Sequence, residues 1–142
     1  MEAKMSELLY KRNRHSCYLL EYHLVVVTKY RHPVLTGAID IRLKEISKRI
    51  LEDDWKCSIQ SMETDKDHIH ILFEAPPQVQ PSKLVNNYKT VTARLLRKEF
   101  AGLLAPWYWK PVFWSDSYFI CSVSDRSRDV VNAYIREQKK KK

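Results

Sequence analysis

Two histidines stand two residues apart, at His68 and His70, in a segment with the pattern of a short β-strand. Successive side chains of a strand point to opposite faces, so both imidazoles lie on one face while Ile69 and Ile71 point to the other. Two imidazoles placed in this way can bind one divalent cation. Five histidines in 142 residues also produce such a pair by chance, so the pair alone favours a metal site only slightly.

A second pair of polar residues, Tyr134 and Gln138, lies one turn apart on one face of a predicted C-terminal helix. The same pattern fits a tyrosine that merely packs in an amphipathic core. Together with His68 and His70, however, the pair suits the cleavage of a phosphodiester. A divalent cation on two imidazoles and an amide oxygen would polarise a phosphate oxygen, and the tyrosine oxygen could then attack the phosphorus. The resulting phosphotyrosine conserves the energy of the broken bond, so a strand could be rejoined without ATP.

The elements that must position these residues follow the order β-α-β-β-α-β, with one further helix at the end. This is the order of the ferredoxin-like split βαβ, an α+β fold in which two helices cover one face of a four-stranded antiparallel sheet. Because Ile69 and Ile71 face the helices, we expect the histidines on the other, uncovered face. The predicted strands are residues 18–28, 56–64, 68–74 and 112–121, and the predicted helices are 38–51, one that begins near 82, and a last one that begins at 124 or 125.

The length and composition indicate one domain, with a basic N-terminal arm over residues 1–16 and the tyrosine helix and lysine tail over 125–142. Four of the eight net positive charges lie in that tail, and further basic clusters suit phosphate neutralisation or simply a solvated surface. The three cysteines are widely spaced and odd in number, which favours a reducing cytoplasm over a disulfide framework. The run 24–27 is only four apolar residues long, so we expect no membrane span, and we see no secretory signal.

Five segments of the chain agree, in one order from about residue 9 to 138, with a known family. Residues 64–72 contain the histidine pair separated by a hydrophobic residue, and residues 134–138 read Tyr-Ile-x-x-Gln. The chain thereby resembles the small single-tyrosine HUH transposases (His, hydrophobic, His) of the insertion-sequence 200/605 type. The other agreeing segments are 21–25 with 28–31, 94–100, and 114–119.

The resemblance implies a function and a site. Tyr134 would be the nucleophile and would form a 5′-phosphotyrosine on single-stranded DNA, while His68, His70 and Gln138 would hold Mg²⁺ or Mn²⁺. Relatives are homodimers that recognise DNA hairpins near the element ends and that excise and insert the element as single strands. Many relatives have a glycine before the tyrosine helix, but residues 122–127 contain none, which puts the movement of this helix in doubt. The helix can return to its own histidine face or reach that of a partner, and the sequence leaves this open.

Asp67 can orient His68 or simply form the hairpin turn.

Several further residues are candidates for DNA contacts. The four aromatic residues Trp107, Tyr108, Trp109 and Trp114 can stack on bases or belong to the core or to a subunit interface. The candidates for phosphate contacts are Lys11, Arg12 and Arg14 in the arm, Lys29 and Arg31 after the first strand, and, more weakly, Lys89 and Arg94 on the second helix.

Two alternative functions remain open from the sequence. A non-enzymatic ferredoxin-like module could bind nucleic acid, but RNA-recognition domains of this topology need an aromatic, glycine-containing strand motif that is absent here. A domesticated nuclease of the same family could instead act on chromosomal repeat hairpins.

Overall fold

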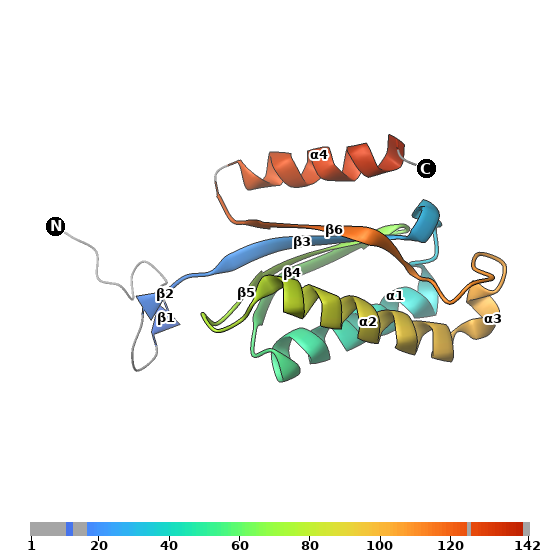
Figure 1. The fold of residues 1–142 in the computed structure, drawn as a ribbon, viewed down its shortest axis with the longest axis horizontal. Helices are drawn as coiled ribbons and strands as arrows, with labels where there is room; N and C mark the ends of the chain where they lie inside the picture. Colours follow the sequence, from blue (N-terminus) through green and yellow to red (C-terminus); the bar gives the residue numbers. More distant parts are fainter. Residues whose placement is uncertain (1–10, 13–16, 125, 141–142) are drawn as a thin grey trace.

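The computed structural model describes residues 11–12, 17–124 and 126–140. Its centre is a four-stranded antiparallel sheet with the strand order β4-β5-β3-β6 (Figure 1). The first strand of this sheet in the sequence, β3, therefore lies between the third, β5, and the fourth, β6. This is the ferredoxin-like topology, and it confirms the predicted fold class. The strands are β3 (Glu21–Thr28), β4 (Ser58–Asp65), β5 (His68–Glu74) and β6 (Trp114–Ser122), and two short strands, β1 (Lys11–Arg12) and β2 (Cys17–Tyr18), pair with each other outside this sheet.

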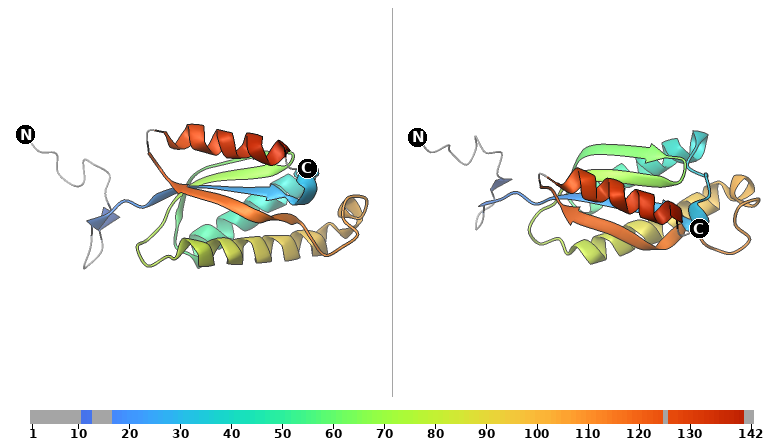
Figure 2. Two further views of the ribbon diagram at one scale, coloured as in Figure 1. Left: turned by 45° about the horizontal axis from the view of Figure 1, so that its top comes forward. Right: turned by 90° about the horizontal axis from the view of Figure 1, so that it is seen from above.

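The helices form layers on both faces of the sheet. The long helices α1 (Gly37–Lys48) and α2 (Pro81–Glu99) cover one face, as predicted, and α4 (Ser127–Lys140) lies on the other (Figures 1 and 2). The expectation that this second face is uncovered is therefore wrong. Val131 of α4 is fully buried against Val25 and Val27 of β3, because β3 is apolar on both of its faces. None of the helices in the described part of the chain is long and apolar enough to cross a membrane.

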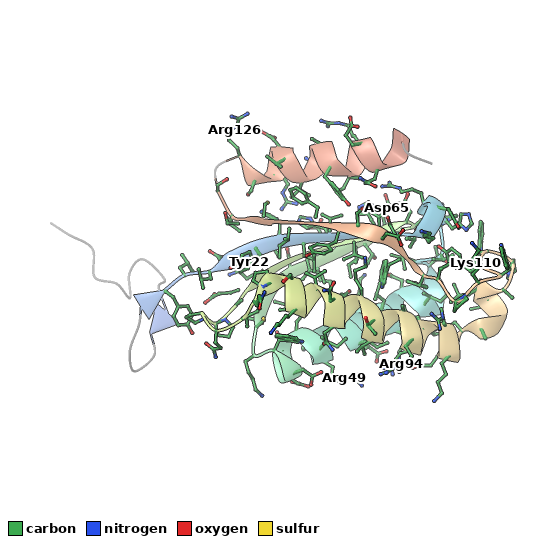
Figure 3. The ribbon with its side chains drawn as sticks, in the orientation of Figure 1. Tyr22, Arg49, Asp65, Arg94, Lys110 and Arg126 are labelled. Carbon is green, nitrogen blue, oxygen red and sulfur yellow. The ribbon has the colours of Figure 1, made fainter. Side chains whose placement is uncertain are left out.

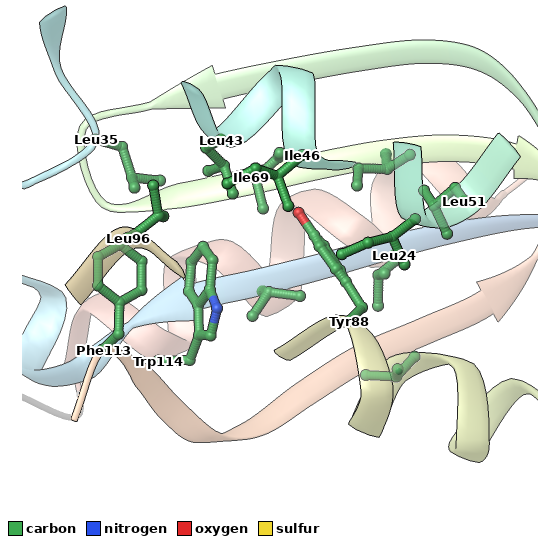
Figure 4. Close-up of a cluster of buried hydrophobic side chains, with 14 of the residues drawn as sticks. Leu24, Leu35, Leu43, Ile46, Leu51, Ile69, Tyr88, Leu96, Phe113 and Trp114 are labelled. Atoms are coloured by element: carbon green, nitrogen blue, oxygen red, sulfur yellow. The ribbon is translucent and has the colours of Figure 1, made fainter. Parts of the chain in front are cut away.

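The main core lies between the sheet and the two long helices. Leu24 and Val26 of β3 and Ile69 and Ile71 of β5 are fully buried there, in alternation with the residues that face α4 (Figure 4). Complete burial of one such side chain contributes roughly 1.5–3 kcal/mol. The alternation of side chains along these two strands therefore divides the two cores.

Element ends differ from the sequence prediction where tertiary contacts extend or shorten them. The first helix was expected to end at 51, but a π-helical turn, η3 (Arg49–Asp54), continues it and buries Ile50 and Leu51. The last strand begins at 114 instead of 112, and the preceding segment contains a short helix that we did not predict, α3 (Ala101–Leu104). A 3-10 turn, η2 (Lys29–Arg31), follows β3 and has left-handed backbone at Tyr30 and Arg31, with φ of 59° and 56°.

A polar contact is enclosed between α1 and α2. The Ser47 hydroxyl donates to the carbonyl of Leu43, at 2.7 Å, and lies 2.7 Å from the Tyr88 hydroxyl. Both side chains are fully buried, and the Tyr88 hydroxyl points toward α1 (Figure 4). Since the serine proton is already given to Leu43, the tyrosine hydroxyl is the donor to Ser47.

We expect Ser47→Ala to lower the free energy of unfolding by about 1–3 kcal/mol, because it leaves the buried Tyr88 hydroxyl without a partner. In a Tyr88→Phe background the same substitution should cost clearly less, since no hydroxyl is then left unpaired. Urea unfolding of the four proteins measures both values. An equal loss in the two backgrounds would contradict the assigned contact.

Candidate active site

The two histidines of β5 lie on the face of the sheet that α4 covers. In the register of the strands His68 is opposite Val27 and His70 is opposite Val25, both on β3. Ile69 and Ile71 point into the opposite core, so the predicted division of the faces is confirmed. His70 is buried and His68 is half-buried. The structure thus brings the histidine pair and the tyrosine helix to the same side of the sheet.

His70 is part of a hydrogen-bonded chain that reaches α4. Its Nε2 atom lies 2.9 Å from Nδ1 of His23 on β3, and Nε2 of His23 lies 2.9 Å from the Ser127 hydroxyl. That hydroxyl donates its proton to the carbonyl of Ser124, at 2.9 Å, so it must accept from His23. His23 then carries its proton on Nε2 and accepts on Nδ1, and His70 donates from Nε2.

This assignment leaves the lone pair of His70 on Nδ1. The guanidinium NH1 of Arg128, in the first turn of α4, lies 3.4 Å from that atom. Arg128 therefore faces the nitrogen that a metal would use in this protonation state. With α4 in this position, a cation could bind His70 only if Arg128 or His23 first moved.

His70 is held in its neutral form. Burial, with the neighbouring His23 and Arg128, lowers the pKa of His70 to about 4, against a smaller opposing effect of Glu63 across from it on β4. The pKa of His23 is also lowered, first by burial and then by Arg128. Neutral imidazole is the form that binds metal ions, so these surroundings suit a ligand.

His68 is held by a carboxylate. Its Nδ1 atom lies 2.9 Å from Oδ1 of Asp67, which leaves Nε2 available to an incoming ligand. A carboxylate on the far nitrogen is the usual way in which proteins orient a metal-binding histidine. Oxygen and nitrogen atoms of Asp65, Asp67 and His68 also lie within 4.8 Å of one another, although Asp67 is already engaged by other partners.

The second oxygen of Asp67 is bound by Arg31. Both Nε and NH2 of the guanidinium lie 2.9 Å from Oδ2, and NH1 donates to the carbonyl of Ile135 on α4, at 3.3 Å. The side chain of Arg31 is only 5% exposed. Arg31 therefore links Asp67, which orients His68, to the backbone of Ile135 on α4, the residue after Tyr134.

Tyr134 lies away from the histidines. Its ring stacks on Phe119 of β6 with centroids 5.0 Å apart, and its hydroxyl is 3.4 Å from that of Ser117. Seen from above, α4 runs over β3 and β6, with the β4–β5 hairpin to one side (Figure 2). Two strand spacings, roughly 10 Å, separate β6 from β5. Among the described side chains no hydrogen bond joins Tyr134 to either histidine.

Gln138 lies at the other end of the same helix face. It lines a hollow of about 290 Å³ together with Thr28, Lys29, Arg31 and Ser115. The helix thus brings Tyr134 and Gln138 to the sheet face that carries His68 and His70. The four predicted site residues do not meet in one cluster within this chain.

The basic residues predicted to contact DNA differ in their surroundings. Arg14 lies outside the described residues, and of Lys11 and Arg12 only the backbone, in β1, is described. Lys29 is mostly covered and forms an ion pair with Asp116, at 3.2 Å.

The predicted phosphate contacts on η2 and α2 also differ in their surroundings. Arg31 is neutralised by Asp67 inside the fold, so the structure gives it an internal ion pair in place of the expected phosphate contact. Lys89 donates to the carbonyl of Ser115, at 2.7 Å. Arg94 is exposed on α2, on the opposite side of the sheet from α4 (Figure 3).

Sequence reasoning missed His23, Ser127 and Arg128. The signal for His23 was its place in β3, where it shares a face with Val25 and Val27. Its partner was not readable, because His23 and His70 are 47 residues apart and His23 and Ser127 are 104 apart.

The surroundings of His70 predict a pH-dependent stability in the absence of metal. Between the ordinary histidine pKa near 6.5 and the folded value of about 4, the unfolded chain binds a proton that the folded chain refuses. The free energy of unfolding should therefore fall as the pH falls through this window. Urea unfolding at several pH values should show a shallower slope for His70→Gln than for the parent protein. Identical slopes would contradict the assigned environment.

Comparison with known proteins identifies the family of this arrangement. Residues 16–138 match the family described as Transposase IS200 like. The ISDra2 transposase TnpA of Deinococcus radiodurans is 34% identical over 128 residues, 90% of either chain, and the transposase for insertion sequence element IS200 of Salmonella typhimurium is 28% identical over 125 residues, 87% of this chain and 80% of its own.

Solved structures agree with these matches. The crystal structure of a transposase from Deinococcus radiodurans has a TM-score of 0.80 at 34% identity and covers 90% of this chain and 97% of its own. A REP-associated tyrosine transposase, solved with a REP hairpin, shares the fold with a TM-score of 0.50 at 11% identity, over 86% of this chain and 67% of its own. The match over residues 16–138 and the 34% identity to ISDra2 TnpA place this protein in the IS200-like transposase family.

Proposed function

We propose that this transposase is a metal-dependent tyrosine nuclease and strand transferase that binds DNA hairpins and cuts single-stranded DNA. The observation that carries the proposal is the docking of α4, with Tyr134, on the sheet face that holds His68 and His70. The 34% identity over 90% of the chain to an insertion-sequence transposase favours this function over action on chromosomal repeat hairpins. The buried histidine network also gives no support to a purely passive binding module.

The covalent step is a transfer of the phosphoryl group to Tyr134. The phenolic oxygen forms a bond to phosphorus, the bond from phosphorus to the 3′ oxygen of the leaving strand breaks, and that oxygen takes up the proton that the phenol has lost. The products are a 5′-phosphotyrosine and a free 3′ hydroxyl. Reversal with a different 3′ hydroxyl joins a new pair of strands and needs no oxidant or cofactor energy.

His68, His70 and Gln138 would hold Mg²⁺ or Mn²⁺. The donor set suits a divalent ion, because it offers two imidazoles and one amide oxygen from the same side of the sheet. When bound, such an ion polarises a phosphate oxygen and stabilises the charge of the transition state. Asp67 fixes the proton of His68 on Nδ1 and so keeps Nε2 free.

The position of α4 bears on how the site is completed. Arg128 faces the free nitrogen of His70, and Tyr134 stacks on Phe119 two strands away from β5. We infer that the described arrangement is a resting one and that α4 must shift or engage a second subunit before the reaction. A homodimer with two-fold symmetry satisfies the second route, because each tyrosine can then serve the histidines of the other subunit.

Tyr134→Phe should abolish the protein–DNA adduct that forms when the protein is incubated with labelled single-stranded hairpin DNA and Mg²⁺ or Mn²⁺. Folding and hairpin binding should persist, since the lost hydroxyl has only the 3.4 Å contact with Ser117. Adducts are read on a denaturing gel. Tyr118→Phe removes the same group from the opposite face of β6 and serves as the matched control. An adduct from Tyr134→Phe would refute the nucleophile, and full activity in EDTA would refute the metal.

Mixing two inactive variants tests the assembly. Tyr134→Phe keeps the histidines, and the double variant His68→Ala, His70→Ala keeps the tyrosine, so neither should cleave alone. We expect the mixture to recover cleavage, because a dimer with exchanged helices contains one complete composite site. Circular dichroism of each variant controls for folding. No recovery from two folded, dimerising variants would show that each tyrosine serves its own subunit.

A further inference from the structure

We propose that a pocket between η2 and the connection from α3 to β6 binds an unpaired nucleobase of single-stranded DNA. The site rests on the proposed function in taking single-stranded DNA as the polymer, and its role in the reaction rests on the proposed cleavage. The pocket has a volume of about 170 Å³ and lies at the end of the molecule that Lys110 marks in Figure 3. It is lined by Tyr30, His32, Trp107, Tyr108, Trp109 and Lys110, together with Val112.

The floor of this pocket is rigid. Tyr108 is buried, and its hydroxyl donates to the carbonyl of Lys29, at 2.8 Å. The ring of His32 stacks on that of Tyr108, with centroids 5.2 Å apart and planes inclined by 20°. The ring of Trp107 packs against His32 at 5.2 Å. Aromatic side chains fixed in this way form a preformed surface for a flat ligand.

The walls are aromatic rings that the fold leaves in water. Trp109 is 87% exposed, Tyr30 is 53% exposed and Trp107 is 42% exposed. By contrast, Trp114 is buried and donates to Thr92, so it belongs to the core. The sequence alone did not separate these roles among the aromatic residues. Exposed aromatic rings around one small pocket suit stacking on bases, which is the main attraction of single-strand binders.

The backbone of η2 is strained in a way that serves this site. Tyr30 and Arg31 both have left-handed backbone, which side chains other than glycine adopt at a cost. The turn sends Arg31 inward to Asp67 and leaves Tyr30 at the pocket. Strain of this kind is commonly stored at functional sites. The ion pair of Arg31 thus holds the wall of the pocket as well as the support of His68.

Cations lie beside two of the aromatic rings. The ammonium of Lys110 lies 4.9 Å from the centroid of Trp109, and that of Lys29, which also pairs with Asp116, lies 5.4 Å from the centroid of Tyr30. Arg97 lines the adjoining hollow together with Tyr108 and Lys110. Flat rings with a cationic rim match a base attached to a phosphate chain. They do not match a second copy of the same patch, because a two-fold interface would bring these cations close to their own equivalents.

The position of the pocket gives it a role in the proposed reaction. Tyr30 also lines the hollow that contains Gln138, so it forms a wall between the two. A strand whose base stacks in the aromatic pocket would therefore pass the predicted metal ligand. We infer that the pocket fixes the strand next to the phosphate that is cut.

The test compares two polymers of equal length and charge, oligothymidylate and the corresponding abasic chain, in a Tyr134→Phe background that cannot cleave. The starting protein should prefer the oligothymidylate, and Trp109→Ala should weaken that binding about ten-fold while leaving abasic binding nearly unchanged. Ile41→Ala is the matched control, because it also removes an exposed apolar side chain, but on α1, away from the pocket. Fluorescence anisotropy of end-labelled chains gives the affinities.

Equal weakening of both polymers, or no weakening, would overturn the pocket. A change from dimer to monomer in Trp109→Ala, measured by sedimentation, with the preference for bases retained, would assign the patch to a subunit interface and also overturn it. These outcomes are separate from the proposed function, because adduct formation by the protein with intact Tyr134 is measured independently. Adducts without base preference would refute only the base-binding pocket. Base preference without adducts would refute only the proposed nuclease activity.

Discussion

The arrangement of the molecule depends on one strand that is buried on both of its faces. Leu24 and Val26 of β3 pack against the helices α1 and α2, while Val25 and Val27 face α4. A strand with a single apolar face would leave the histidine side of the sheet open to water. Because the second face is apolar as well, α4 packs on it, and this places the helix with Tyr134 on the sheet face that carries the histidines (Figure 1).

The apolar contact of α4 is small, so polar contacts hold much of its position. Val131 is the one fully buried apolar side chain of the helix among the described residues. Ser127 and Arg128 reach the pair formed by His23 and His70, and the carbonyl of Ile135 accepts from Arg31. Each of these contacts ends on a histidine of the candidate site or on the group that supports one. The position of the helix and the state of the histidines are therefore coupled, since any ligand that favours one arrangement of His70 changes the contacts available to α4.

The basic residues divide into internal and external groups. Arg31 is neutralised by Asp67 and acts inside the fold, whereas Lys29 and Lys110 lie against aromatic rings near the surface. Charge counting cannot separate these groups, because a buried arginine and a surface lysine each count as one positive charge in the net charge of +8. Lys29 and Lys110 lie against exposed rings of the aromatic pocket, which shares Tyr30 with the hollow that contains Gln138.

The sequence by itself determined the order of the elements, the fold class and the face on which His68 and His70 lie. These follow from the periods of strands and helices, which are local properties, and the spaced motifs pointed to the family. The tertiary structure decided which side chains meet across that face. His23 reaches His70 only through the register of β3 against β5. Tyr134 lies over Phe119 because α4 packs across β3 and β6. Arg31 turns inward because the backbone after β3 is left-handed. Such pairings join residues far apart in the chain, and no local pattern specifies them.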